Sequence, residues 1–158
     1  MYYDKSKITT HEKKAEELFL SGYNCAQSVF AAFSDMTGLS VEDSARMASA
    51  LGGGMSGKRS VCGTVTGMML VLSCLKGYSD GNDREGKVAL YADGKALLDE
   101  FEEIFGTLIC RELLVGRKLS PTPSVRTEEY YASRPCASYC AVAANILDNY
   151  LESLEKKA

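Results

Sequence analysis

Residues 52–67 read GGGMSGKRSVCGTVTG and contain six glycines and one cysteine, Cys62. They lie between two segments whose apolar residues recur at helical spacing. A helical protein has little reason to hold three consecutive glycines unless the backbone needs unusual dihedral angles or approaches another part of the molecule closely. We therefore expect this stretch to separate two helices and to hold Cys62 at the start of the second.

The same stretch matches the beginning of two phosphate-binding motifs. Residues 52–57 fit G-x-G-x-x-G, and residues 52–58 fit the start of a Walker A loop. Both motifs follow a β-strand, whereas the segment before residue 52 is predicted to be helical, and Arg59 stands where Walker A needs Ser or Thr. Nucleotide binding is therefore disfavoured. Lys58, Arg59 and the backbone N–H groups before Cys62 are instead expected to form a positive pocket that lowers the pKa of this cysteine.

Outside this stretch, helical periodicity with capping and stop residues covers most of the chain. The expected helices run from Thr9 or Thr10 to Gly22 and over 24–38, 40–51, 61–75, 84–105, 108–115 and 135–155, with one turn at 127–132 and a loop at 116–124. Strand signals are almost absent. These features predict an all-α, single-domain helical bundle of about six to seven helices over residues 1–158, with residues 1–9 flexible.

Composition narrows the classes of function. The 158 residues carry a net charge of −3, and neither sign of charge is collected into a block, so nucleic acid is not expected as a partner. The N-terminal residues are polar, which argues against a secretory signal, and no apolar run is long enough for direct membrane insertion. We therefore expect a cytoplasmic protein.

Six cysteines in a chain of this kind favour redox chemistry or metal binding over structural disulfides. Four of them, Cys25, Cys62, Cys110 and Cys136, fall in the first turns of expected helices. The start of a helix presents unpaired N–H groups and the positive end of its dipole, which favours thiolate over thiol. If the four helix starts converge, they form either a redox-active dithiol site or a thiolate metal site.

The two remaining cysteines and the single histidine are weaker candidates for the functional site. Cys74 lies in an apolar helix and is expected to pack in the core. Cys140 lies one turn beyond Cys136 on the same helix face. It is suited to bind a metal or resolve a disulfide together with Cys136, and equally to be a buried core residue. His11 is expected at the surface, and the sequence has no C-x-x-C, so a zinc finger or ribbon is not predicted.

Three short stretches together resemble one known family. They are GYNCAQ at residues 22–27, CGTVTG at residues 62–67 and CREL at residues 110–113, followed by Cys136. With this set the chain resembles the C-GCAxxG-C-C family of redox-active proteins over about residues 10–150. The resemblance implies that the four cysteines shared by the family correspond to Cys25, Cys62, Cys110 and Cys136. In the central motif Cys62 precedes Gly63 where the family has glycine before cysteine, and Thr64 replaces alanine.

The first functional hypothesis is a redox protein that uses helix-start thiolates for thiol–disulfide or electron-transfer chemistry. As a thiol–disulfide oxidoreductase it would use Cys62 as the attacking thiol, with Cys25, Cys110 or Cys136 as the resolving thiol. Arg111, Lys58 and Arg59 are expected to favour the thiolates. The redox partner is unknown, and a homodimer is compatible with the many apolar helix faces.

Two alternatives stay open. The same four cysteines, with Cys140 as a further candidate, are suited to an iron–sulfur cluster or another thiolate-bound metal. Such a module is a candidate accessory to a transporter, because members of the family are often encoded near transporter genes. The other alternative is a plain helical interaction domain whose cysteines are core residues.

Overall fold

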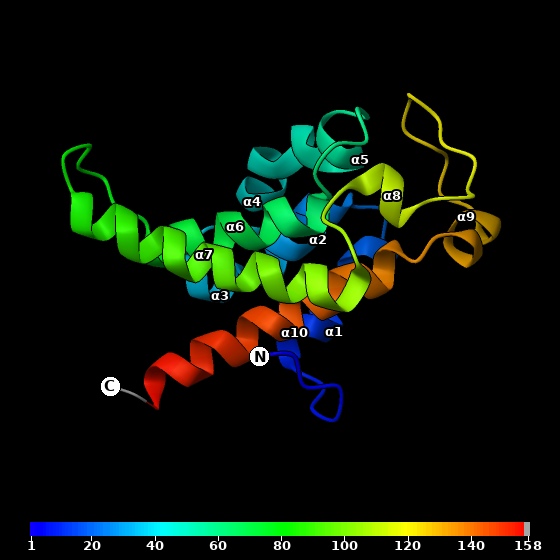
Figure 1. Ribbon diagram of the computed structural model, residues 1–158. Coiled ribbons are helices and arrows are strands. Elements are labelled where there is room, and N and C mark those ends of the chain that lie inside the picture. The colour runs from blue at the N-terminus through cyan, green and yellow to red at the C-terminus, as the bar shows by residue number, and fades with distance from the viewer. Residues whose placement is uncertain (157–158) are drawn as a thin grey trace.

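The computed structural model describes residues 1–156, which fold into helices joined by short loops (Figure 1). The helices are α1 (Thr10–Leu20), α2 (Cys25–Ala32), α3 (Ser34–Thr37), α4 (Val41–Ala48), η1 (Ser49–Leu51), α5 (Gly52–Met55), α6 (Gly63–Lys76), α7 (Arg84–Phe105), α8 (Cys110–Leu113), α9 (Glu128–Ser133) and α10 (Cys136–Glu155). No β-strand occurs within the described residues, and six of these helices have eight or more residues. The predicted all-α fold is confirmed.

Side-chain caps fix the starts of the helices as the sequence predicted. The Thr9 hydroxyl accepts a hydrogen bond from the Glu12 N–H, and the Glu12 carboxylate accepts one from the Thr9 N–H. Asn24 forms the same reciprocal pair with Gln27 at the start of α2. Such capping boxes satisfy N–H groups that have no partner inside the helix.

Two of the differences between predicted and observed helices concern the segments that carry Cys25 and Cys62. The helix expected over 24–38 is broken at Phe33, whose φ of −94° and ψ of 21° end α2 and begin α3. The helix expected over 61–75 begins at Gly63, because the backbone of Val61 and Cys62 is extended and pairs with another loop. Both differences fall at helix boundaries, where sequence signals are weakest.

The core is built around α2 and α10. Almost every residue of α2 is buried, because α1, α4 and α6 all pack against it. The helix α10 packs along α1 and also contacts α2, α6 and α7. Figure 1 shows α7 and α10 as the two longest ribbons, crossing the same side of the molecule. The starts of α2, α6, α8 and α10 consequently face the same region.

The N-terminal residues are tied to two helices. The backbone N–H groups of Tyr2 and Tyr3 donate to the Glu100 carboxylate on α7, and the Asp4 N–H donates to the Asn145 side chain on α10 at 3.1 Å. None of the helices within residues 1–156 is long and apolar enough to cross a membrane.

Candidate functional site: a cavity lined by four cysteines

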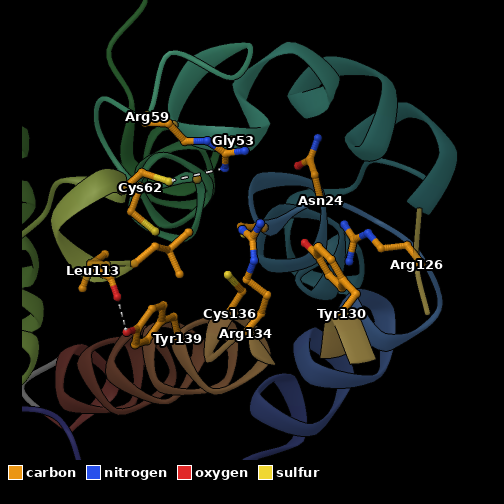
Figure 2. Close-up of a pocket in the computed structure, with 15 residues that line it drawn as sticks. Asn24, Gly53, Arg59, Cys62, Leu113, Arg126, Tyr130, Arg134, Cys136 and Tyr139 are labelled. Atoms are coloured by element: carbon orange, nitrogen blue, oxygen red, sulfur yellow. Dashed lines mark hydrogen bonds between the residues drawn. The ribbon is translucent and has the colours of Figure 1, made fainter. Parts of the chain in front are cut away.

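Each of the four predicted cysteines lies at the start of a helix. Cys25, Cys110 and Cys136 are the first residues of α2, α8 and α10, and Cys62 is the residue before α6. All four line a single cavity of about 60 Å³, which we call the thiol cavity (Figure 2). The structure therefore brings these residues together. Their chemical roles remain proposals.

Asn24 positions the start of α2. Its side-chain oxygen accepts from the Gln27 N–H at 2.9 Å, and its Nδ2 donates to the Ser49 carbonyl at 3.0 Å. The Gln27 side chain also donates to the Ala45 carbonyl at 2.9 Å. The polar residues around Cys25 thus connect this helix start to α4 and η1.

A short backbone pairing brings Cys62 and Cys110 to the same wall. Val61 and Ile109 form an isolated antiparallel bridge. The Cys62 N–H donates to the Leu108 carbonyl at 2.8 Å, and the Cys110 N–H donates to the Ser60 carbonyl at 2.6 Å. Because side chains alternate along extended backbone, the two cysteines that follow the bridged residues point to the same side. The pairing is too short to leave an alternating pattern in the sequence.

The glycine-rich stretch before this pairing turns with left-handed backbone. Gly53, Gly54, Met55 and Ser56 have φ values of 63°, 64°, 70° and 49°. A Cβ atom on Gly54 would lie 2.7 Å from the Cβ of Cys110 and 2.7 Å from the Ser60 nitrogen. Glycine is needed here both for its conformation and for the close approach. The stretch therefore supports Cys110, and it follows helical residues instead of the strand that precedes a phosphate-binding motif.

Two other glycines allow close packing beside Cys25. A Cβ atom on Gly52 would lie 2.5 Å from the Asn24 side chain. One on Gly63 would lie 3.1 Å from the Cβ of Cys25. The starts of α2 and α6 can therefore approach each other only because these positions lack side chains.

Cys25 lies near two other thiols. The Cys136 thiol in the cavity and the Cys140 thiol behind it each affect the pKa of Cys25 through a side-chain interaction. Cys140 lies behind the cavity wall, fully buried, with its thiol 3.8 Å from the Cys25 carbonyl oxygen. Cys25 is the one member of the four that is partly exposed. Cys62 instead contacts the Thr64 hydroxyl, at 3.0 Å.

Burial sets the protonation of these thiols. It raises the pKa of Cys62 to about 11, although Thr64 acts in the opposite direction. The pKa of Cys136 is raised by its interaction with Cys25 and then by burial. The Cys136 thiol lowers the pKa of Cys25, but the Cys140 thiol and burial outweigh this effect and leave it well above the usual value. The expected lowering of the Cys62 pKa is thus not observed, because desolvation exceeds the effect of the helix start.

The positive side chains lie elsewhere than expected. Arg59 approaches Cys110, with its Nη1 at 3.9 Å from the sulfur, and does not contact Cys62. Lys58 and Arg111 are exposed and do not line the thiol cavity. Arg59 itself has a φ of 58°, an uncommon conformation for a residue with a side chain. The left-handed turn therefore directs the Arg59 guanidinium toward the cavity.

Several residues of the site were not predicted from the sequence. Arg126, Tyr130, Arg134 and Tyr139 also line the thiol cavity, and Figure 2 shows the guanidinium of Arg134 pointing toward its centre. Nearby positive charge from Arg134 and Arg126 acts to lower the pKa of Cys136, against the stronger effects that raise it. The Tyr139 hydroxyl donates to the Leu113 carbonyl at 3.1 Å and so joins α10 to α8. The loop that carries Arg126 has no helical periodicity, which left no signal for its position.

A larger hollow of about 380 Å³, which we call the vestibule, lies beside the thiol cavity. The two share part of their lining, including Asn24, Arg59, Arg126, Tyr130 and Arg134. Residues 121–124 also line the vestibule. Three arginines are therefore common to the vestibule and the cavity that holds the cysteines.

Two further expectations are corrected by the structure. Cys74 is exposed on α6 and does not pack in the core, because it lies on the face of this helix that points away from α2. The side chain of His11 is only 11% exposed and lies between Asp148 and Asp35, with contacts of 2.6 and 3.0 Å. Its ring also stacks on the Phe33 ring, with 4.1 Å between the two ring centres. His11 is therefore part of a structural cluster near α10.

The arrangement of ligands bears on the metal alternative. Among residues 1–156, no group of three or more His, Cys, Asp or Glu side chains is arranged to hold a metal ion. The four cavity cysteines thus share one cavity without forming a ligand set in this geometry. Cys25 and Cys136 each shift the other's pKa, which indicates that these two thiols are near neighbours.

The fold and the cavity define the class: an all-α protein with four helix-start cysteines around one cavity. Residues 23–150 match the family described as "Putative redox-active protein (C_GCAxxG_C_C)". The chain belongs to this family, as the resemblance of its cysteine motifs indicated. No curated protein and no solved structure matches the chain.

Proposed function

We propose that this chain is a thiol–disulfide redox protein whose working dithiol is Cys25 and Cys136. The observation that carries the proposal is that both residues begin helices that meet at the thiol cavity, where each thiol shifts the pKa of the other. Two cysteines whose side chains are near each other need little backbone movement to form a disulfide, whereas distant ones cannot be bridged. Membership of a family described as redox-active supports the same chemistry.

We assign the attacking role to Cys25 and the resolving role to Cys136. The sequence favoured Cys62 as the attacking thiol, but Cys62 is only 4% exposed and contacts Thr64. Cys25 is partly exposed and has Cys136 beside it. Cys25 is therefore the least enclosed of the four residues and the best placed to meet an incoming disulfide, and its neighbour can then resolve the mixed disulfide.

Cys62 and Cys110 form the facing wall of the same cavity. We propose that they support the working pair and become oxidised only after it, because Cys62 contacts the Thr64 hydroxyl and Cys110 lies near the Arg59 guanidinium. The alternative of a thiolate-bound metal or an iron–sulfur cluster requires the four sulfurs to rearrange into a ligand set. The dithiol needs no such rearrangement and is the better supported proposal.

The test is an equilibrium titration in dithiothreitol redox buffers, with free thiols counted after acid quenching. We expect the protein to lose two of its six thiols reversibly. The Cys25→Ser and Cys136→Ser variants should lose this transition. The matched control is Cys74→Ser, which removes an exposed cysteine outside the cavity and should leave the transition unchanged. The proposal would be overturned if the transition persists in Cys25→Ser. It would also be overturned if the purified wild type contains bound metal that is lost when the four cavity cysteines are replaced by serine.

A further inference from the structure

Three arginines gather at the vestibule without a carboxylate to neutralise them. Arg59, Arg126 and Arg134 line both the vestibule and the thiol cavity, and neither lining includes Asp or Glu. Within residues 1–156, none of the three forms an ion pair. The chain as a whole carries a net charge of −3. This positive surface is therefore a local feature of the site.

The contacts of these arginines orient them but do not cancel their charge. Arg126 donates to the Tyr23 carbonyl at 3.0 Å and lies 4.7 Å from the centre of the Tyr130 ring. Arg134 lies 5.1 Å from the same ring. Aromatic faces and carbonyl oxygens hold a guanidinium in place while its positive charge stays available to a ligand.

Two of the guanidinium groups also have donors without an acceptor. Arg59 Nε and Arg126 Nη1 are buried and have no hydrogen-bond partner among the described residues. Buried donors of this kind are nearly always satisfied, and a guanidinium fork matches the two oxygens of a carboxylate. Two of the arginines that line the vestibule thus carry both positive charge and unsatisfied donors, which a carboxylate ligand can use.

We propose that the vestibule binds a small disulfide bearing carboxylate groups and presents its sulfur–sulfur bond to Cys25. This inference rests on the proposed function. The three arginines would hold the carboxylates, and the same three arginines also line the thiol cavity (Figure 2). A hollow of about 380 Å³ suits a small molecule and is too small for a folded partner.

The reaction balances without any further reagent for one turnover. The Cys25 thiol loses its proton and attacks one sulfur of the substrate, forming a mixed disulfide and breaking the substrate's sulfur–sulfur bond. The released thiolate takes up the proton. Cys136 then attacks the Cys25 sulfur, forms the protein disulfide and releases the second substrate thiol in the same way. The substrate disulfide is reduced, the protein dithiol is oxidised, and a dithiol reductant returns the protein to its starting state.

The experiment compares three disulfides of similar length and different charge. They are 3,3′-dithiodipropionate, a dianion, bis(2-hydroxyethyl) disulfide, which is neutral, and cystamine, a dication. We expect the dianion to oxidise the reduced protein roughly tenfold or more faster than the neutral compound, and cystamine to be slowest. The preference should shrink when salt is raised, because ions screen the arginines.

The ratio of the dianion and neutral rates separates substrate binding from thiol activation. An arginine that only lowers a thiol pKa accelerates all three disulfides alike and leaves this ratio unchanged. Arg134→Gln and Arg59→Gln are expected to bring the ratio close to one. Lys58→Gln is the matched control, because it removes a positive charge from the same loop at an exposed position outside both linings. Helical circular dichroism verifies that each variant is folded.

Direct binding distinguishes failure of this inference from failure of the proposed function. Adipate has two carboxylates and no sulfur, and calorimetry should show that it binds the wild-type protein but not Arg134→Gln. If all three disulfides react at equal rates and adipate does not bind, the inference is overturned and the proposed function stands. If no disulfide reacts but adipate binds at the arginines, the vestibule is an anion site and the disulfide chemistry is overturned.

Discussion

Cys25, at the start of α2, and Cys136, at the start of α10, line the same cavity, and each thiol shifts the pKa of the other. The two residues are far apart in the chain, and their helices contact each other within the core. Because both helix starts are fixed by packing against neighbouring elements, the proximity of the two thiols is a property of the fold. A redox change at this pair is therefore expected to act on the junction between two core helices.

The pH dependence of stability should report the burial of Cys62. Burial raises its pKa from 9.0 to about 11, so the folded protein holds this proton more tightly than the unfolded chain does. The resulting stabilisation is complete below pH 9 and is lost as the pH rises toward 11, by about 3 kcal/mol in all. Urea unfolding of the wild type and Cys62→Ser between these pH values measures it. A free energy of unfolding that falls equally in both proteins would contradict the assignment.

Gly54 should be among the least replaceable residues of the site. Its φ is 64°, and a Cβ atom would lie 2.7 Å from the Cβ of Cys110. We expect Gly54→Ala to lower the free energy of unfolding by about 2–4 kcal/mol and to disturb the wall that carries Cys110. Gly81→Ala is the control, because a Cβ atom there meets nothing within 4 Å. Similar losses in the two variants would show that the close approach is not important.

Asn24 is expected to influence the reactivity of Cys25 as well as stability. Asn24→Ala removes the cap of α2 and the hydrogen bond to the Ser49 carbonyl, so the start of the helix should loosen at a cost of about 1 kcal/mol or more. Iodoacetamide labelling of Cys25, followed by peptide mass spectrometry, should become faster.

The control for Asn24 is Ser40→Ala, which removes the cap of α4. It should cost a similar amount of stability without changing the labelling of Cys25. If the two variants label Cys25 at the same rate, Asn24 acts on stability alone.

The starts of the helices could be predicted because their signals are local. Thr9, Asn24 and Ser40 each satisfy the N–H groups of the turn that follows them, and this need is visible in the sequence itself. The placement of Cys25 at a helix start followed directly from the Asn24 cap, whereas α6, α8 and α10 begin without a side-chain cap and were placed from glycine, proline and apolar spacing.

The features that the sequence did not predict depend on contacts between distant segments. The bridge between Val61 and Ile109 involves one residue from each loop, which is too short for a strand pattern. The exposed position of Cys74 depends on which face of α6 packs against α2. The raised pKa of Cys62 depends on the surrounding core, and desolvation there outweighs the local effect of a helix start.

The most direct test of the account is to identify the first disulfide that forms when the reduced protein is oxidised. The protein would be treated with one equivalent of oxidised dithiothreitol, alkylated, digested without reduction and analysed by mass spectrometry. The account predicts that the peptides containing Cys25 and Cys136 are joined to each other and that the peptide containing Cys74 stays alkylated. A first disulfide between Cys62 and Cys110, or one that includes Cys74, would contradict the central claim.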